Sequence, residues 1–191
     1  GLFEMQGEGL KEITNPSEIF LNTDSATGIA TIVSCEGTRS IAVDLQALIS
    51  PTTYASPRRT STGIENNRLH QILAVIEKHM GLTLSRYDCY LAVAGGLSVD
   101  EPAADLGIAA AIISSYKEIQ IPKGLVIIGE LGLGGQLRRV GQMDQRLQEA
   151  ERLGFKKAVI PKGSRNSRLS NNKNLELIEV SNINEAIINL L

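Results

Sequence analysis

Several residue types are scarce in this sequence, and each scarcity excludes a class of structure or function. Tryptophan is absent and aromatic residues make up only 4% of the 191 residues, so binding of single-stranded nucleic acid by base stacking is not expected. Ile, Leu, Val and Ala must fill the core instead, and a hydrophobic content of 42% is enough for one. The length predicts one compact domain, or one domain with a short N-terminal extension.

Cysteine and histidine are also scarce, which argues against a metal site. Cys35 and Cys89 each lie in an apolar, strand-like run without zinc-finger spacing, so we expect both to be reduced core residues of a cytosolic protein. His70 and His79 lie nine positions apart on a predicted helix, and therefore on opposite sides of it. We expect this chain to bind no metal. No apolar run is long enough to cross a bilayer and no signal peptide is visible, so the predicted location is cytoplasmic, without a membrane partner.

A nucleotide-binding loop is missing as well. The pattern Gly-x-x-x-x-Gly-Lys-Ser/Thr does not occur, and the Gly-x-Gly-Gly run at 132–135 lacks the rest of a dinucleotide-binding fingerprint. We interpret this run as a hairpin turn. The formal net charge is −2, so a nucleic-acid site would have to be a local basic patch.

The stretch that organises the chain runs from Leu91 to Ser115. It predicts a buried strand, a turn at Gly95 and Gly96, and a helix that begins near Pro102. This helix is apolar on nearly every side, so it is expected at the centre of the domain rather than on its surface. Its many alanines allow neighbouring elements to approach closely.

Strands and helices alternate less regularly in the rest of the chain. A hairpin of residues 28–35 and 40–49 is predicted first, then a loop at 51–63 and a helix that Asn66 or Asn67 caps and Gly81 ends. The remaining predictions are strands at 88–93, 124–128, 158–160 and 175–180, a helix at 143–153, and a last helix after a capping box of Asn182 and Glu185. This order predicts an α+β domain of two or more layers.

Two stretches resemble the Lon-type serine proteases. That family carries a nucleophilic serine in a Pro-Ser-Ala-Gly pattern, and a partner lysine some forty residues later in a Gly-Gly-x-Lys-x-Lys pattern. Here the first place reads Glu101-Pro-Ala-Ala-Asp105 and the second Val140-Gly-Gln-Met-Asp-Gln-Arg-Leu147, so Ala103 and Asp144 occupy the two catalytic positions. A methyl group cannot attack a carbonyl carbon, and a carboxylate cannot replace the activating amine. The resemblance implies a multi-layered Lon protease-like domain (the ribosomal protein S5 domain 2-like group) that is a pseudo-protease and not an enzyme.

A second resemblance covers nearly the whole chain. The sequence is similar to the C-terminal part of the RadA (Sms) family of bacterial DNA repair proteins at Phe3-Glu-Met5, Asn15-Pro-Ser-Glu18, Glu36-Gly-Thr-Arg39, Ser56-Pro-Arg-Arg59, Asn67-Arg-Leu69, Ala94-Gly-Gly96, Glu101-Pro-Ala-Ala-Asp105, Gly129-Glu130 and Leu153-Gly-Phe-Lys156. The chain begins at Gly1 without a methionine, so we interpret it as a piece of a longer protein. We expect residues 1–24 to be an extension from an upstream domain and residues 25–191 to be the Lon-like domain.

The RadA resemblance also implies partners. Members of that family carry a zinc finger and a RecA-like ATPase upstream, so ATP, Mg and Zn are expected there and no cofactor is expected in this chain. The whole protein would be a hexameric, DNA-dependent ATPase and helicase that drives branch migration on single-stranded or branched DNA together with the recombinase RecA. This domain would act as an oligomerisation scaffold and DNA-binding platform.

Two alternatives remain open at this stage. The first is an active serine peptidase with a relocated dyad, in which Ser98, Ser114 or Ser115 would need a desolvated amine from Lys117 or Lys123. The second alternative is a metal site formed by the acidic residues at the start of the central helix. Otherwise these residues would complement the positive end of the helix dipole. These residues are Asp100, Glu101 and Asp105.

Basic residues are the candidates for contact with DNA phosphates, which needs arginine and lysine on one face without sequence reading. Arg58 and Arg59 lie next to each other on a proline-flanked loop, where we expect water, an acidic group of another subunit, or phosphate as their partner. The other candidates are Arg68, Arg138, Arg139, Arg146, Lys156 and Lys157, with Lys162, Arg165 and Arg168 nearby in the sequence.

Overall fold

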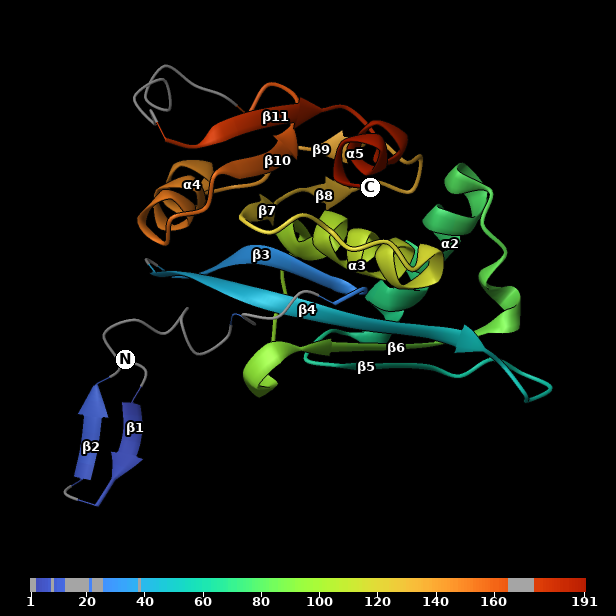
Figure 1. The fold of residues 1–191 in the computed structure, drawn as a ribbon, viewed down its shortest axis with the longest axis horizontal. Coiled ribbons are helices and arrows are strands. Elements are labelled where there is room, and N and C mark those ends of the chain that lie inside the picture. Colours follow the sequence, from blue (N-terminus) through green and yellow to red (C-terminus); the bar gives the residue numbers. More distant parts are fainter. Residues whose placement is uncertain (1–2, 8, 13–20, 22–25, 38, 165–173) are drawn as a thin grey trace.

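The computed structural model describes residues 3–7, 9–12, 21, 26–37, 39–164 and 174–191. Its lower layer is a four-stranded sheet, its middle layer is the central helix, and its upper layer is a three-stranded sheet with further helices (Figure 1). The lower sheet has the strand order β3-β4-β6-β5 and is formed by β3 (Ile29–Glu36), β4 (Arg39–Pro51), β5 (Arg59–Thr62) and β6 (Tyr87–Val93). The mixture of helices and several sheets confirms the α+β prediction.

The predicted hairpin is formed by β3 and β4, which pair antiparallel from Ile29 opposite Gln46 to Glu36 opposite Arg39. Strand β5 was not predicted, because its four residues lie in a stretch rich in Pro, Thr and Ser. It pairs parallel to β6, with Arg59 opposite Cys89. A parallel partner comes from a distant part of the chain and leaves no local pattern in the sequence.

Helix α3 (Asp105–Lys117) is buried as predicted, since every residue from Asp105 to Ser115 is buried. It lies on β3 and β4, and α2 (Asn66–Met80) lies beside it. Gly107 lets the helix approach the sheet closely, because a Cβ at this position would lie 2.2 Å from Cγ2 of Ile32. A short 3-10 turn, Pro102–Ala104, precedes the helix.

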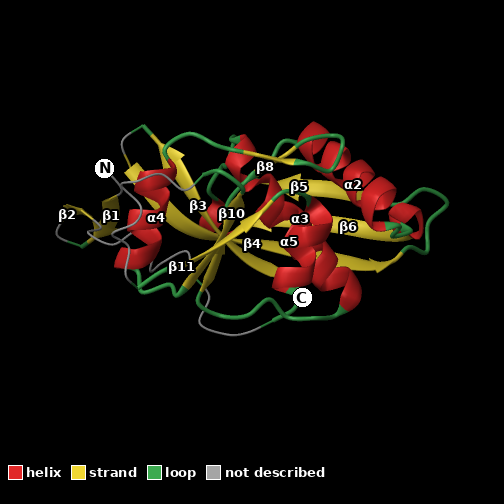
Figure 2. Ribbon diagram, turned by 90° about the horizontal axis from the view of Figure 1, so that it is seen from above, coloured by secondary structure: helices red, strands yellow, loops and turns green. Residues whose placement is uncertain are grey.

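The upper layer is built from β7 (Leu125–Ile127), β10 (Lys157–Pro161) and β11 (Glu176–Val180), which are all parallel in the order β11-β10-β7. Seen from above, this sheet runs obliquely across β4, with α4 (Met143–Arg152) towards one end and α5 (Ile183–Leu190) towards the other (Figure 2). The Gly-x-Gly-Gly run is the turn of a small hairpin between β8 (Glu130–Leu131) and β9 (Leu137–Arg138), as predicted.

A further hairpin of β1 (Phe3–Gln6) and β2 (Gly9–Glu12) forms a two-stranded sheet of its own. Residues 13–20 and 22–25, where we expect the boundary between extension and domain, lie outside the described residues. The division into 1–24 and 25–191 therefore stays a prediction. In the part of the chain that is described, none of the helices has both the length and the apolar character needed to cross a membrane.

Two of the predicted helix ends are confirmed by the structure, and one is not. Gly81 ends α2 in the left-handed conformation (φ 67°), and Asn182 caps α5 by accepting from the Glu185 N–H at 2.9 Å. The predicted asparagine cap of α2 is wrong. The N-cap is Glu65, and Asn66 instead accepts hydrogen bonds from the N–H and the hydroxyl of Ser61.

The close approach at Gly107 leads to a testable prediction. Replacing glycine with alanine inside a helix normally stabilises a protein, but here the added methyl would collide with Ile32. We expect Gly107→Ala to lower the free energy of unfolding by about 1–3 kcal/mol, as overpacking does. Urea denaturation of the variant and the parent chain measures the difference.

Gly141→Ala is the matched control, because no described atom lies within 4 Å of a Cβ at that position. We expect it to leave stability unchanged or to raise it slightly. A Gly107→Ala variant as stable as the Gly141→Ala variant would contradict the close packing of α3 on β3.

Candidate functional site

The two positions that the sequence resemblance aligns with a Lon-type dyad hold a methyl group, at Ala103, and a carboxylate, at Asp144. Ala103 is 3% exposed and belongs to an apolar cluster that also contains Met143 and Leu147. Its carbonyl oxygen accepts a hydrogen bond from the N–H of Gly129 at 2.9 Å. Asp144 is in the first turn of α4 and lines a pocket. The first position therefore contributes only a methyl group to the core.

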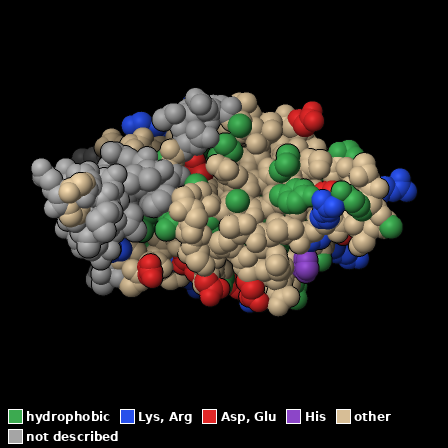
Figure 3. Space-filling model, turned by 90° about the horizontal axis from the view of Figure 1, so that it is seen from below, with side chains coloured by type: hydrophobic (Ala, Val, Ile, Leu, Met, Phe, Trp, Pro, Cys, Tyr) green, Lys and Arg blue, Asp and Glu red, His purple; other side chains and the backbone are tan. Residues whose placement is uncertain are grey.

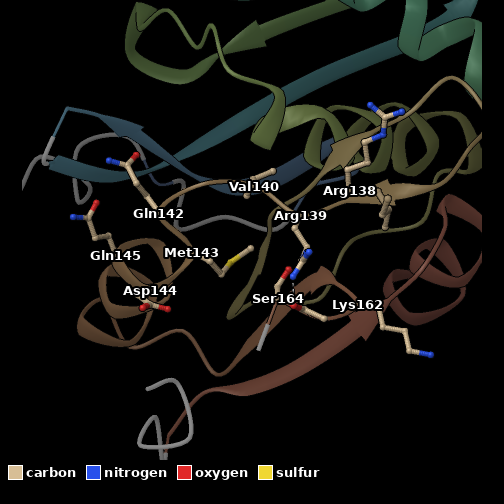
Figure 4. A pocket seen from close by; sticks show the side chains of 11 residues that line it. Arg138, Arg139, Val140, Gln142, Met143, Asp144, Gln145, Lys162 and Ser164 are labelled. Carbon is tan, nitrogen blue, oxygen red and sulfur yellow. Dashed lines mark hydrogen bonds between the residues drawn. The ribbon is translucent and has the colours of Figure 1, made fainter. Parts of the chain in front are cut away.

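That pocket lies between the β9–α4 connection, the first turn of α4 and the residues after β10 (Figure 4). Its volume is about 1050 Å³. Three cationic side chains and one carboxylate are among its described lining residues, which are Leu137, Arg138, Arg139, Val140, Gln142, Met143, Asp144, Gln145, Lys162, Gly163 and Ser164. Ser164 is buried.

The serines near the central helix are engaged in structural hydrogen bonds. Ser114 Oγ accepts from the N–H of Gly28 (2.9 Å) and donates to the carbonyl oxygen of Ile119 (2.6 Å). Ser115 Oγ accepts from the N–H of Ile49 (2.9 Å). These bonds fasten the end of α3 to the four-stranded sheet. Ser98, Lys117 and Lys123 are exposed, so both lysines that a relocated dyad would use face solvent.

Glu101 does not cap the central helix but forms a buried ion pair with Arg146 of α4. The two Arg146 NH groups contact the two carboxylate oxygens at 2.6 and 2.9 Å, and NH1 also donates to the carbonyl oxygen of Val33 at 2.6 Å. Burial acts to raise the pKa of Glu101, but the hydrogen bonds from Arg146 and from the Cys35 N–H outweigh it, and the pKa is lowered. The pair joins β3, the turn before α3, and α4.

Asp105 forms the second ion pair, with Arg68 of α2. Arg68 Nε donates to Asp105 Oδ1 at 2.6 Å, its NH2 contacts Oδ2, and the N–H of Leu131 donates to Oδ2 at 3.0 Å. Burial raises the pKa of Asp105, and the hydrogen bonds from Arg68 and Leu131 only partly oppose it. Glu101 and Asp105 therefore each form an ion pair, and Asp105 also lies in the first turn of α3 as a carboxylate that complements the helix dipole does. In the described part of the chain, no three His, Cys, Asp or Glu residues are placed to hold a metal ion.

These pairs change the set of DNA-contact candidates. Arg146 is only 3% exposed, so a DNA phosphate cannot reach its guanidinium unless the pair with Glu101 breaks. Arg68 is partly exposed but is held by Asp105. Both arginines connect elements of the fold. The burial of Arg146 corrects its sequence-based interpretation as a phosphate contact, whereas the same interpretation of Arg68 stays a prediction.

Arg58 and Arg59 lie in the lower layer, next to β5. The guanidinium of Arg58 is exposed and stacks 3.7 Å from the ring centroid of Tyr54, and its backbone N–H donates to Asp88 Oδ1 at 2.8 Å. Arg59 is half-buried and donates to the carbonyl oxygen of Leu84 at 3.0 Å. Figure 3, the view of this layer from below, shows apolar side chains gathered towards one end with basic side chains among them.

The remaining candidates lie in the upper layer, at both ends of β10. Arg138 and Arg139 share the pocket with Lys162, which follows the end of β10. Lys156 and Lys157 lie at the start of that strand, roughly 16 Å away along an extended chain. The described basic residues therefore form separate groups rather than one face. Arg165 and Arg168 lie outside the described residues.

Comparison with known protein families identifies the family of this chain. The model of the family described as "Subunit ChlI of Mg-chelatase" matches residues 58–164, which is more than half of the chain. The chain belongs to this family. The ChlI-family segment contains α3, both ion pairs and the pocket. The family's description names a Mg-chelatase, and that activity is said only of the protein for which the family is named.

Three curated relatives are each named DNA repair protein RadA. The chain is 54% identical to the one from Synechocystis over 165 residues, 48% identical to the one from Bacillus subtilis over 189, and 46% identical to the one from Streptococcus pneumoniae over 189. These alignments cover 85%, 98% and 98% of this chain, but 33%, 41% and 45% of the relatives. The chain thus spans between a third and a half of the proteins it matches.

The ion pair of the ChlI-family segment leads to a second prediction. Removing Arg146 leaves the largely buried Glu101 without its partner, so we expect Arg146→Met to lower the free energy of unfolding by about 3–5 kcal/mol. Arg152 is the control, because it lies on the same helix and its own side chain is 50% exposed in the pair with Glu149. Arg152→Ala should cost less than about 1 kcal/mol. Equal losses in chemical denaturation would refute the structural role of Arg146.

Proposed function

We propose that this chain is the non-catalytic domain of a RadA-type DNA repair ATPase, in which it serves as an assembly scaffold and contacts DNA phosphates. The observation that supports this proposal is a buried methyl at Ala103 and a carboxylate at Asp144, the two positions that the resemblance aligns with a serine–lysine dyad. The relatives named DNA repair protein RadA support the DNA repair role. The Lon protease-like frame is part of the proposal and rests on the sequence resemblance.

The chemistry of the described groups supports the proposed absence of peptidase activity. A serine nucleophile needs an adjacent base, and a lysine base needs desolvation to lower its pKa. The hydroxyls of Ser114 and Ser115 are occupied by backbone groups, while Lys117 is exposed at the end of α3. With these partners, none of the three side chains is prepared for acyl transfer.

The proposed DNA contact relies on exposed arginine and lysine, because phosphate recognition does not need aromatic stacking. Arg58 is the clearest candidate in the lower layer, since its backbone is fixed by Asp88 while its side chain is exposed. The whole protein would supply the ATPase, ATP, Mg and Zn from upstream domains, assemble as a hexamer, work with RecA and drive branch migration. In that assembly the exposed loop after Pro51 is a candidate subunit contact.

A third prediction tests the missing chemistry. We expect no hydrolysis of casein or of fluorogenic peptides by the chain, because the nucleophile position holds a methyl group. Turnover that disappears in Ser98→Ala, Ser114→Ala or Ser115→Ala would disprove the proposal and restore the relocated peptidase. The folded state of each variant is checked by circular dichroism.

A fourth prediction tests the DNA contact in the lower layer. If Arg58 and Arg59 contact phosphates, Arg58→Ala/Arg59→Ala should weaken binding equally for all sequences. The slope of log affinity against log salt should fall by roughly one to two units, about 0.9 per lost contact. Fluorescence anisotropy with labelled duplexes over a salt series measures both quantities.

Arg152→Ala removes the same kind of charge from the upper layer and is the control for a general charge effect. A subunit contact would give a different result, because the double variant would then sediment as a smaller assembly with an unchanged salt slope. Affinity and slope both equal to those of the parent chain would eliminate a DNA role for these arginines.

A further inference from the structure

We propose that the pocket in front of α4, with Arg139 and Ser164 at its centre, binds a phosphate group. The identity of the group rests on the proposed function, within which it is a phosphate of the DNA strand. The pocket occupies the region of the degenerate dyad, since Asp144 lines it, and no role has been assigned to it above. Three independent features of the pocket point to an anion.

The first feature is the hydroxyl of Ser164. This residue is only 9% exposed, and its Oγ is buried without a hydrogen-bond partner among the residues that the structure describes. Buried hydroxyls in folded proteins are nearly always paired, because an unpaired one loses its hydrogen bonds to water without replacement. Ser164 lines the pocket, so a ligand that enters there can supply the missing acceptor.

The second feature is the N-terminus of α4, a ten-residue helix. The N–H groups of a helix's first turn lack intrahelical acceptors and carry partial positive charge, which favours an anion. The N-cap residue Gln142 has a left-handed conformation (φ 57°), and none of the described side chains caps the helix. Its own amide points elsewhere, because Nε2 donates to the carbonyl oxygen of Gly37 at 2.8 Å.

The third feature is the charge around these groups. Figure 4 shows Arg139 and Ser164 pointing towards one another, whereas Arg138 and Lys162 point outwards. Arg139 NH1 donates to the carbonyl oxygen of Gly163 over 3.4 Å, near the limit for a hydrogen bond, so little holds the guanidinium against a better acceptor. Arg138 is exposed in a pair with Glu130 at 3.5 Å, so its charge lies at the rim.

Two carboxylates limit the attraction. Asp144 is the one acidic side chain among the described lining residues, and it opposes three cationic side chains. Glu179 accepts from the N–H of Gly163 at 2.9 Å, so this N–H is not available to a ligand. What remains is a set of donors: a guanidinium, a hydroxyl and a helix N-terminus, with the ammonium of Lys162 directed outwards. Phosphate suits this set because it offers several acceptor oxygens to charged donors at once.

Titration with inorganic phosphate tests the site directly. In ¹⁵N-labelled chain, saturable shifts are expected at the amides of Gln142–Gln145 and Ser164, and Arg139→Ala should weaken the affinity by roughly tenfold. Lys156→Ala removes one exposed charge at the other end of β10 and should leave phosphate binding unchanged. Shifts that do not saturate at these amides, or that persist unchanged in Arg139→Ala, would overturn the site.

Ser164→Ala separates binding from folding. The substitution removes a hydroxyl that lacks a described partner, so the melting temperature without phosphate should stay equal or rise. The rise in melting temperature caused by phosphate should become smaller than in the parent chain. A lower melting temperature both with and without phosphate, with the same phosphate-induced rise, would mean that Ser164 is structural only and would overturn its role.

Titration with a short labelled oligonucleotide identifies the source of the phosphate. If the source is DNA, Arg139→Ala weakens oligonucleotide binding by roughly tenfold and inorganic phosphate competes. Phosphate binding in the pocket without any binding of DNA would refute the proposed function and leave the site in place for a free phosphate. DNA binding that is equal in parent and Arg139→Ala, with no saturable phosphate shifts, would refute this inference and leave the proposed function in place.

Discussion

The complete burial of α3 is the constraint on which the rest of the structure depends. Every residue from Asp105 to Ser115 is buried, so this helix needs partners on all sides and each polar group at its ends needs a specific one. At its start, Arg68 and Arg146 neutralise Asp105 and Glu101 and thereby attach α2 and α4. At its end, Ser114 and Ser115 bind the backbone at the ends of the β3–β4 hairpin.

The same constraint acts on the stretch that resembles the Lon-type proteases in sequence. Ala103 lies where the chain enters the buried helix and fills core space, so a side chain at this position contributes to packing. Arg146, two residues after Asp144, is directed inwards to Glu101 and determines how α4 is oriented. The N-terminus of α4 then borders the pocket with Arg139 and Ser164.

Much of the fold could be predicted from the sequence because its signals are local. The apolar stripe of α2, Gly81 at its end and the Asn182–Glu185 capping box each act within a few residues. The pairing of β5 with β6 and the Glu101–Arg146 pair join residues far apart in the chain, and neither leaves a local pattern. For that reason the buried Arg146 was interpreted as a DNA contact.

Hydrogen exchange measured with and without DNA tests the central claim most directly, because it reports where on this framework a DNA strand binds. The account predicts slower exchange on adding DNA at residues 138–145 and 162–164 around the pocket. Exchange in α3 should not change, since that helix is already buried. Protection that is absent from both pocket segments at saturating DNA would contradict the account.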